Sequence, residues 1–153
     1  MTLLEQPVVV FITGISAAGK STVADLLAQR FERGVHVKGD LFRRMIVAGR
    51  EDMTVTPSED ALRQLSLRYR LGASTADAYF RQGFSVVVQD VVLGPDLVNY
   101  AKSIRSRPLV VVVLDALVAS HRLEGRPIRA ARREHAFALH EQHVTHVAAV
   151  LEW

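Results

Sequence analysis

Gly14-Ile15-Ser16-Ala17-Ala18-Gly19-Lys20-Ser21-Thr22 fits the phosphate-binding pattern G-x-x-x-x-G-K-[ST] at every required position. The residues before it, 8–12, form an unbroken run of β-branched and aromatic side chains, which predicts a strand buried on both faces. After it, apolar residues recur at helical spacing over 23–31. The motif therefore lies between a strand and a helix, which is the context that a phosphate-binding loop needs.

The residue types in this loop suit a bound polyphosphate. Glycines let the backbone turn its N–H groups inward, and the helix N-terminus adds its positive dipole end. Lys20 would reach the β- and γ-phosphates, and the Ser21 hydroxyl would bind Mg²⁺. We therefore predict ATP and Mg²⁺ as cofactors, with the following residues at the nucleotide: Gly14, Ser16, Ala17, Ala18, Gly19, Lys20, Ser21 and Thr22.

Composition is that of an ordinary soluble protein. The 153 residues are 49% hydrophobic and 23% charged, which fits one domain over 1–153 with a proper core. No apolar run is long enough to span a membrane, and the absence of cysteine excludes thiolate metal sites and fits a cytoplasmic protein. A net charge of +3 suits a phosphate-handling pocket better than a nucleic-acid surface.

Strands alternate with helices along the rest of the chain. Strands are predicted over 35–38, 84–90 and 109–114, and helices over 20–33, 41–47, 57–82, 95–104 and, with a break at 125–127, from 117 to 151. Thr56 is predicted to cap the long third helix, with Pro57 at its first position. Gly72 stands in the middle of that helix without a reason in the sequence. The alternation predicts an α/β fold with a parallel sheet covered on both faces.

Asp40 follows the second predicted strand at the sheet edge where ligands bind in open α/β folds. A carboxylate there could accept the proton of a substrate hydroxyl as that hydroxyl attacks the γ-phosphate. It could equally be the N-cap of the next helix, and both roles could hold together. Arg43 and Arg44 follow closely, and one of them could orient the acceptor.

Asp90 ends the third predicted strand and resembles the aspartate that organises Mg²⁺ in nucleotide-binding proteins. The next residue is Val91, where motor ATPases usually place a glutamate that activates water. The chain also has no Asn-Lys-x-Asp guanine-recognition motif. Both absences favour phosphoryl transfer to an acceptor over a motor or a GTPase.

Five arginines fall within twelve residues, at 122, 126, 129, 132 and 133. Guanidinium groups neutralise charge on a transferring phosphoryl group, and a mobile lid often delivers them, although a solvated helix face is the alternative for several. We predict that Arg126 contacts the nucleotide and that Arg129 and Arg133 act in catalysis. His143 and His146 could share a metal, but a His-rich surface helix is the simpler interpretation.

Three stretches together resemble the chloramphenicol phosphotransferase-like family of small P-loop kinases: F-I-T-G-I-S-A-A-G-K-S-T, V-K-G-D-L-F and V-V-V-Q-D-V-V-L-G. The resemblance covers residues 8–133. It implies a P-loop NTPase three-layer fold with a sheet ordered 2-3-1-4, possibly with a fifth strand, and an Arg-rich lid at about 120–135 after the fourth strand. It also implies that Asp40 is the base for the acceptor hydroxyl and that Asp90 is the metal-organising aspartate.

Two functions from different classes fit these features. The first is a kinase that moves the γ-phosphate of ATP to a hydroxyl of a small molecule, such as an antibiotic, a nucleoside or a sugar-like compound. The second is a nucleotide-binding module with little catalysis. Lys20, Asp40, Asp90 and the arginine cluster favour the kinase, because a mere binder needs only the loop. Neither function involves nucleic acid or a membrane, and the oligomeric state stays open.

Overall fold

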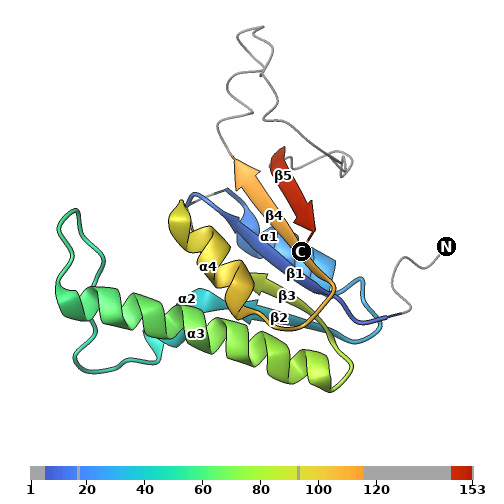
Figure 1. Ribbon diagram of the computed structural model, residues 1–153, viewed down its shortest axis with the longest axis horizontal. Coiled ribbons are helices and arrows are strands. Elements are labelled where there is room, and N and C mark those ends of the chain that lie inside the picture. The colour runs from blue at the N-terminus through green and yellow to red at the C-terminus, as the bar shows by residue number, and fades with distance from the viewer. Residues whose placement is uncertain (1–5, 17, 93, 116–145, 153) are drawn as a thin grey trace, which may run out of the picture.

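A five-stranded sheet runs through the molecule in the order β2-β3-β1-β4-β5 (Figure 1). The computed structural model describes residues 6–16, 18–92, 94–115 and 146–152. The strands are β1 (Val9–Gly14), β2 (Gly34–Lys38), β3 (Ser85–Gln89), β4 (Leu109–Asp115) and β5 (His146–Glu152). The helices are α1 (Lys20–Ala28), α2 (Gly39–Arg44), α3 (Glu59–Arg81) and α4 (Pro95–Ser103).

The first four strands are parallel. β2 and β3 end level with each other, and β1 continues two residues further. Gln89 of β3 pairs with Ile12 of β1 on one side and with Lys38 of β2 on the other. The segments that leave these strands therefore emerge at one edge of the sheet. These segments carry the phosphate-binding loop, Asp40 and Asp90. The predicted α/β fold and the sheet order 2-3-1-4 are confirmed.

Helices cover both faces of the sheet, α1 on one and α3 with α4 on the other (Figure 1). Alternate residues of β1 serve the two sides, because side chains of a strand point to opposite faces. Val9 and Phe11 join the core under α3 and α4, whereas Val10 and Ile12 join the core under α1. This two-sided burial explains why the strand is apolar without interruption, and each such side chain stabilises the fold by about 1.5–3 kcal/mol.

Four predicted helix boundaries are wrong: the end of α1, both ends of α2 and the start of α3. Helix α1 ends at Ala28, and Gly34 opens β2, where a Cβ would stand only 1.8 Å from the Ala28 carbonyl oxygen. Helix α2 begins at Gly39 with Lys38 in the N-cap position, so Asp40 lies in the first turn and is not the cap. Helix α3 is capped by Ser58.

The cap of α3 lies two residues beyond the predicted Thr56. The Ser58 hydroxyl accepts a hydrogen bond from the Ala61 backbone N–H at 3.0 Å, as an N-cap side chain does. Serine is the better N-cap of the two residue types, which fits the later start of this helix.

Gly72 has a packing reason that the sequence did not reveal. A Cβ at this position would stand 2.4 Å from the Tyr100 hydroxyl of α4. The Tyr100 ring in turn packs on Phe11 and Tyr69, with centroid distances of 4.5 and 5.2 Å. Gly72 therefore lets α3 lie close to α4. In the described part of the chain the buried Tyr100 hydroxyl has no hydrogen-bond partner.

The C-terminal segment 146–152 is a strand, although its sequence predicted a helix. β5 pairs antiparallel with β4, with Val112 opposite Val150, and its register shifts between Val113 and Leu114. A short apolar run cannot be assigned to helix or strand by periodicity alone. Here β4 offers an open edge, and pairing satisfies the backbone groups of both strands. None of the described helices is both long enough and apolar enough to cross a membrane.

Candidate functional site

The phosphate-binding loop is held by glycines at both ends. Gly14 has a φ of +142°, and a Cβ there would stand 2.1 Å from the Leu114 carbonyl oxygen. Gly19 is the N-cap of α1 in the left-handed conformation, and no side chain caps this helix. The N–H groups of the first turn of α1 are thus available to an anion. They border a pocket of about 280 Å³ lined by Ala18, Gly19, Lys20, Ser21, Thr22 and Gln89.

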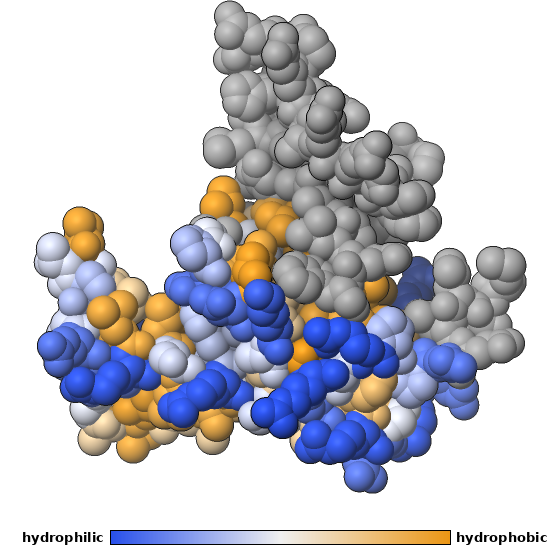
Figure 2. Space-filling view, viewed as in Figure 1, coloured by the Kyte–Doolittle hydropathy of each residue, from blue (hydrophilic) through white to orange (hydrophobic). Residues whose placement is uncertain are grey.

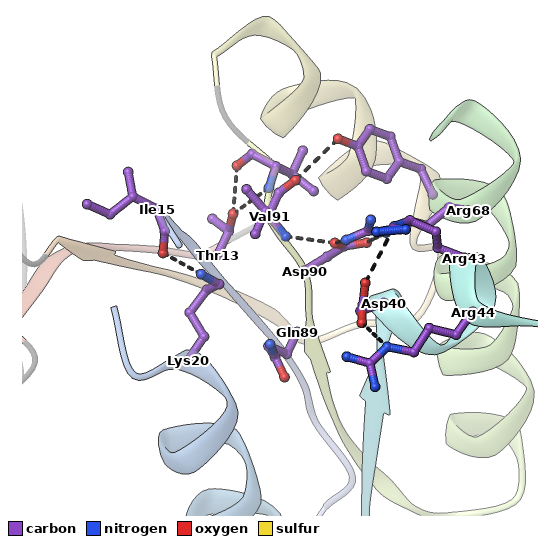
Figure 3. A network of polar contacts seen from close by, with 12 residues as sticks. Thr13, Ile15, Lys20, Asp40, Arg43, Arg44, Arg68, Gln89, Asp90 and Val91 are labelled. Carbon is purple, nitrogen blue, oxygen red and sulfur yellow. Dashed lines mark hydrogen bonds and ion pairs between the residues drawn. The ribbon is translucent and has the colours of Figure 1, made fainter. Parts of the chain in front are cut away.

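Lys20 is buried, and its Nζ donates a hydrogen bond to the Ile15 carbonyl oxygen at 2.5 Å. The amine therefore lies across the loop (Figure 3). Burial lowers the pKa of Lys20, and the negative charge of Asp90 acts in the opposite direction. An ammonium group held at this place is suited to neutralising phosphate oxygens.

Asp90 lies beyond the end of β3 and is 2% exposed. Both of its oxygens bind Arg68 of α3: Nε donates to Oδ2 at 3.0 Å, and a terminal guanidinium nitrogen donates to Oδ1. The Val91 N–H donates to the same Oδ1 at 2.7 Å. Burial raises the pKa of Asp90, although Arg68 opposes that rise. A Cβ on Gly39 would stand 2.0 Å from Oδ2, so this glycine makes room for the carboxylate.

The backbone just after Asp90 is hydrogen-bonded to Thr13 of β1. The buried Thr13 hydroxyl donates to the Val92 carbonyl oxygen at 2.6 Å and accepts from the Val92 N–H at 2.9 Å. The Tyr69 hydroxyl donates to the Val91 carbonyl oxygen at 3.3 Å, and burial raises the pKa of Tyr69 to about 12. These bonds fix the segment that carries the Asp90 carboxylate.

Asp40 lies beside this pair on the first turn of α2 and is half-exposed (Figure 3). Its Oδ2 lies 2.5 Å from Arg44 Nε, and its Oδ1 lies 3.8 Å from Arg43 Nε. The charge of Asp40 contributes to the raised pKa of Asp90, so the two carboxylates are close enough to interact. The site therefore combines two acidic side chains with three arginines at one sheet edge.

A second, larger pocket of about 530 Å³ opens between α2, the loop 45–58 and α3. Arg43 and Arg68 line it and connect it to Asp40 and Asp90. The remaining lining residues are mostly apolar: Phe42, Met45, Ile46, Glu51, Asp52, Met53, Ala61, Gln64, Leu65, Leu67 and Leu71. Asp40 and Asp90 are therefore next to this pocket through their arginine partners, although neither carboxylate lines it.

A comparison with family models matches residues 2–126 to the Zeta toxin family. The chain belongs to the Zeta toxin family. A search of curated proteins finds no match. Among solved structures, a mutant APS kinase CysC of Mycobacterium tuberculosis is similar, with 19% identity, a TM-score of 0.56, and coverage of 73% of this chain and 78% of that one. A sugar kinase from Janibacter sp. has 21% identity and a TM-score of 0.51, with coverage of 80% and 68%.

These comparisons confirm that this Zeta toxin family chain is P-loop kinase-like. The similarity to the two kinases shows a shared fold, because both identities are below 25%. The predicted resemblance to small P-loop kinases is confirmed at this level. The chloramphenicol phosphotransferase-like family itself is not confirmed by any of the matches.

The structure brings together most of the predicted site of this Zeta toxin family member. Lys20, Ser21 and Thr22 line the loop pocket, and Asp40 and Asp90 lie at the same sheet edge. Several predictions lie outside the described residues: Ala17, Arg126, Arg129, Arg133, His143 and the lid at about 120–135. In the described part of the chain, no group of three or more His, Cys, Asp or Glu side chains could hold a metal ion.

Sequence reasoning missed Arg68 and Gln89. Arg68 falls in the apolar stripe of α3, seven residues after Ala61 and four before Gly72, and a charged residue in such a stripe signals a buried partner. Gln89 lies one residue before Asp90 and lines the loop pocket, because successive side chains at the end of a strand point to opposite faces.

His36 contacts both Gln89 of the loop pocket and Asp25 of α1. His36 Nε2 lies 3.0 Å from Gln89 Oε1, and His36 Nδ1 lies 2.6 Å from Asp25 Oδ1. Because a carboxylate accepts only, Nδ1 carries the proton of that bond. The hydrogen bond from His36 lowers the pKa of Asp25. This chain of contacts links α1, β2 and β3, and no sequence pattern predicted it.

Proposed function

We propose that this chain is a kinase that transfers the γ-phosphate of ATP to a hydroxyl group of a small molecule. The observation that supports this most strongly is the place of Asp40. Its carboxylate lies on the first turn of α2, directly after β2. It contacts Arg43, which lines the larger pocket, and its charge acts on Asp90 at the end of β3. A nucleotide-binding module needs only the loop pocket, whereas a transferase needs a second pocket with a proton acceptor beside it.

In this mechanism the loop holds the nucleotide and Asp40 activates the acceptor. The N–H groups at the start of α1 and the Lys20 ammonium bind the phosphates. The acceptor oxygen attacks the γ-phosphorus and gives its proton to the Asp40 carboxylate. A new oxygen–phosphorus bond forms, the bond from the γ-phosphorus to the bridging oxygen breaks, and ADP leaves with that electron pair.

Mg²⁺ would neutralise charge on the phosphate oxygens when it is bound. The Ser21 hydroxyl fits this ion, because it is exposed in the loop pocket and a hard cation prefers oxygen ligands. Asp90 fits it less directly, since both of its oxygens are hydrogen-bonded within the protein, and it would act on the water molecules of the ion. The roles of Arg126, Arg129 and Arg133 at the transferring phosphate remain predictions from the sequence.

A screen of hydroxylated compounds with Mg²⁺ and γ-labelled ATP tests this function. We expect ADP release that depends on the acceptor, with the label recovered on the acceptor. Label that stays in ATP with every compound, while ATP still binds, would show a nucleotide-binding module. Label recovered only as inorganic phosphate, at a rate independent of the compound added, would show an ATPase.

A further inference from the structure

Gln89 lies between the two strand ends that lead into the site. It pairs with Ile12 of β1 and with Lys38 of β2. β1 leads into the phosphate-binding loop, and β2 leads to Asp40. Gln89 lines the loop pocket together with Lys20, and in the view of Figure 3 it lies between Lys20 and Asp40. A phosphate that passes from the loop to a hydroxyl beside Asp40 would therefore pass close to Gln89.

We propose that Gln89 binds the terminal phosphate of ATP through its amide NH₂ group, and that His36 holds the amide in this orientation. Gln89 would then favour ATP over ADP, because only ATP has a phosphate at this place. This inference rests on the proposed function for ATP as the phosphate donor.

His36 is hydrogen-bonded at both of its ring nitrogens. Nδ1 lies 2.6 Å from Asp25 Oδ1, and Nε2 lies 3.0 Å from Gln89 Oε1. Both oxygens are acceptors, so both nitrogens donate and the ring is an imidazolium in this arrangement. The Asp25 carboxylate stabilises that charge, and its other oxygen lies 3.5 Å from Lys38 Nζ. Because the His36 side chain is only 7% exposed, its ring is a fixed support for the amide.

The carbonyl oxygen of Gln89 is thus used by His36, which leaves the NH₂ group for a ligand in the loop pocket. An amide NH₂ group only donates hydrogen bonds, and a phosphate oxygen accepts them. A water molecule bound to Mg²⁺ presents its hydrogen atoms outward, so it does not match this donor. The amide therefore suits a phosphate oxygen and not the hydration shell of the ion.

Gln89 also lies on the α1 side of the sheet. Val87, two residues earlier on β3, packs in the core under α1, and alternate residues of a strand share one face. Asp90 follows Gln89 and binds Arg68 of α3 on the opposite side. The hydrophobic surface that Figure 2 shows over the first half of α3 belongs to that opposite side. Gln89 shares its side with the N-terminus of α1, where phosphates would bind.

Displacement of a fluorescent ADP from the full chain tests this inference without any catalytic step. The competitors are ADP and adenylyl imidodiphosphate, a non-hydrolysable ATP analogue, each with Mg²⁺. The ratio of their affinities is compared between variants, because a loss of folded protein affects both nucleotides equally. The native chain should bind the ATP analogue more tightly than ADP.

Gln89→Met removes the donor at similar volume, and we expect the preference for the ATP analogue to fall at least about fivefold. Gln89→Glu keeps an oxygen for His36 but puts a second oxygen at the phosphate, so it should lose more. Gln29→Glu adds the same charge at the exposed end of α1 and should keep the native preference. An unchanged preference in Gln89→Met would overturn the proposal. A stronger preference would also overturn it, because the carbonyl oxygen would then face the phosphates.

A double-mutant cycle tests the positioning role of His36. His36→Leu should lower the preference in the native background and have little further effect in the Gln89→Met background. Equal effects in both backgrounds would show that His36 does not act through Gln89.

Phosphoryl transfer separates this inference from the proposed function. A chain that transfers phosphate, while Gln89→Met keeps the native preference, would support the kinase and reject the inference. A preference that falls as expected, in a chain that transfers phosphate to no acceptor, would leave the inference standing and reject the kinase function. A native chain that binds neither nucleotide would overturn both.

Discussion

The loop pocket draws almost all of its lining from five consecutive residues, 18–22, whereas the pocket between α2 and α3 draws on two helices and the loop that joins them. The first pocket presents backbone N–H groups and one buried lysine, and the second presents mostly apolar side chains. A polyphosphate is bound by backbone geometry that a short motif specifies. The pocket between α2 and α3 is shaped by side chains, which can vary without disturbing the motif. Asp40 and Asp90 contact Arg43 and Arg68, which line the pocket between α2 and α3.

The role of the phosphate-binding loop is tested most directly by Lys20→Ala. We expect phosphoryl transfer to fall below detection, because the proposed reaction needs the Lys20 charge at the phosphates. Thermal unfolding should stay near that of the native chain, and Lys102→Ala, an exposed lysine on α4, should transfer normally. A Lys20→Ala chain that melts normally and keeps full turnover would contradict the role of the loop.

The buried Arg68–Asp90 pair is tested by Arg68→Met, which leaves the Asp90 carboxylate without its partner. We expect a loss of about 3–5 kcal/mol in the free energy of unfolding, measured by urea titration. Without Arg68 the pKa of Asp90 rises further above its ordinary value, so the folded state binds the proton more readily than the unfolded state. The stability of the variant should therefore increase as the pH falls through that raised pKa toward the lower pKa of the unfolded chain.

Two controls sharpen this test. Arg70→Met, an exposed neighbour on α3, should change stability little, and Arg68→Met combined with Asp90→Leu should recover much of the loss. Equal losses in Arg68→Met and Arg70→Met would show that the buried pair contributes nothing.

The close packing of α3 on α4 is tested by Gly72→Ala. Alanine favours a helix by about 1 kcal/mol relative to glycine, but its Cβ would stand 2.4 Å from the Tyr100 hydroxyl. We expect a net loss of about 1–2 kcal/mol in the free energy of unfolding, because overpacking outweighs propensity. Tyr100→Phe removes the hydroxyl and should turn the same substitution neutral or stabilising. A stabilising Gly72→Ala in the native background would contradict the close contact of α3 and α4.

The smallest effect concerns the contacts under the loop pocket. His36 lowers the pKa of Asp25, so the Asp25 carboxylate stabilises the fold above its unfolded pKa and loses this contribution as the pH falls through the lower folded value. The melting temperatures of native and Asp25→Asn chains should thus differ near neutral pH and converge below about pH 4. Glu32→Gln, at an exposed acidic residue, should show no such convergence. A difference that stays constant over this range would show that the pair is not linked to pH.

The sheet and the loop pocket could be predicted from the sequence because their signals are contiguous. Apolar runs and glycine spacing specify β1, the loop and α1 within about twenty residues of chain. The Arg68–Asp90 pair could not be derived in this way, since it joins residues 22 apart through tertiary packing. The strand β5 was missed for a related reason, because the free edge of β4, and not the local sequence, decides its conformation.

The rate of phosphoryl transfer in Asp40→Asn, with an acceptor found in the screen, tests the account most directly. Asn keeps the size of Asp but cannot take a proton, and a general base contributes about 10²–10⁴-fold in rate. Because Asp40 lies in the first turn of α2 and is not its cap, the variant should lose at most about 1 kcal/mol of stability and keep its affinity for ATP. Asp52→Asn, which removes the other carboxylate bound to Arg43, serves as the control. The account predicts that kcat falls at least about 10²-fold in Asp40→Asn and much less in Asp52→Asn. A near-native kcat in Asp40→Asn would contradict it.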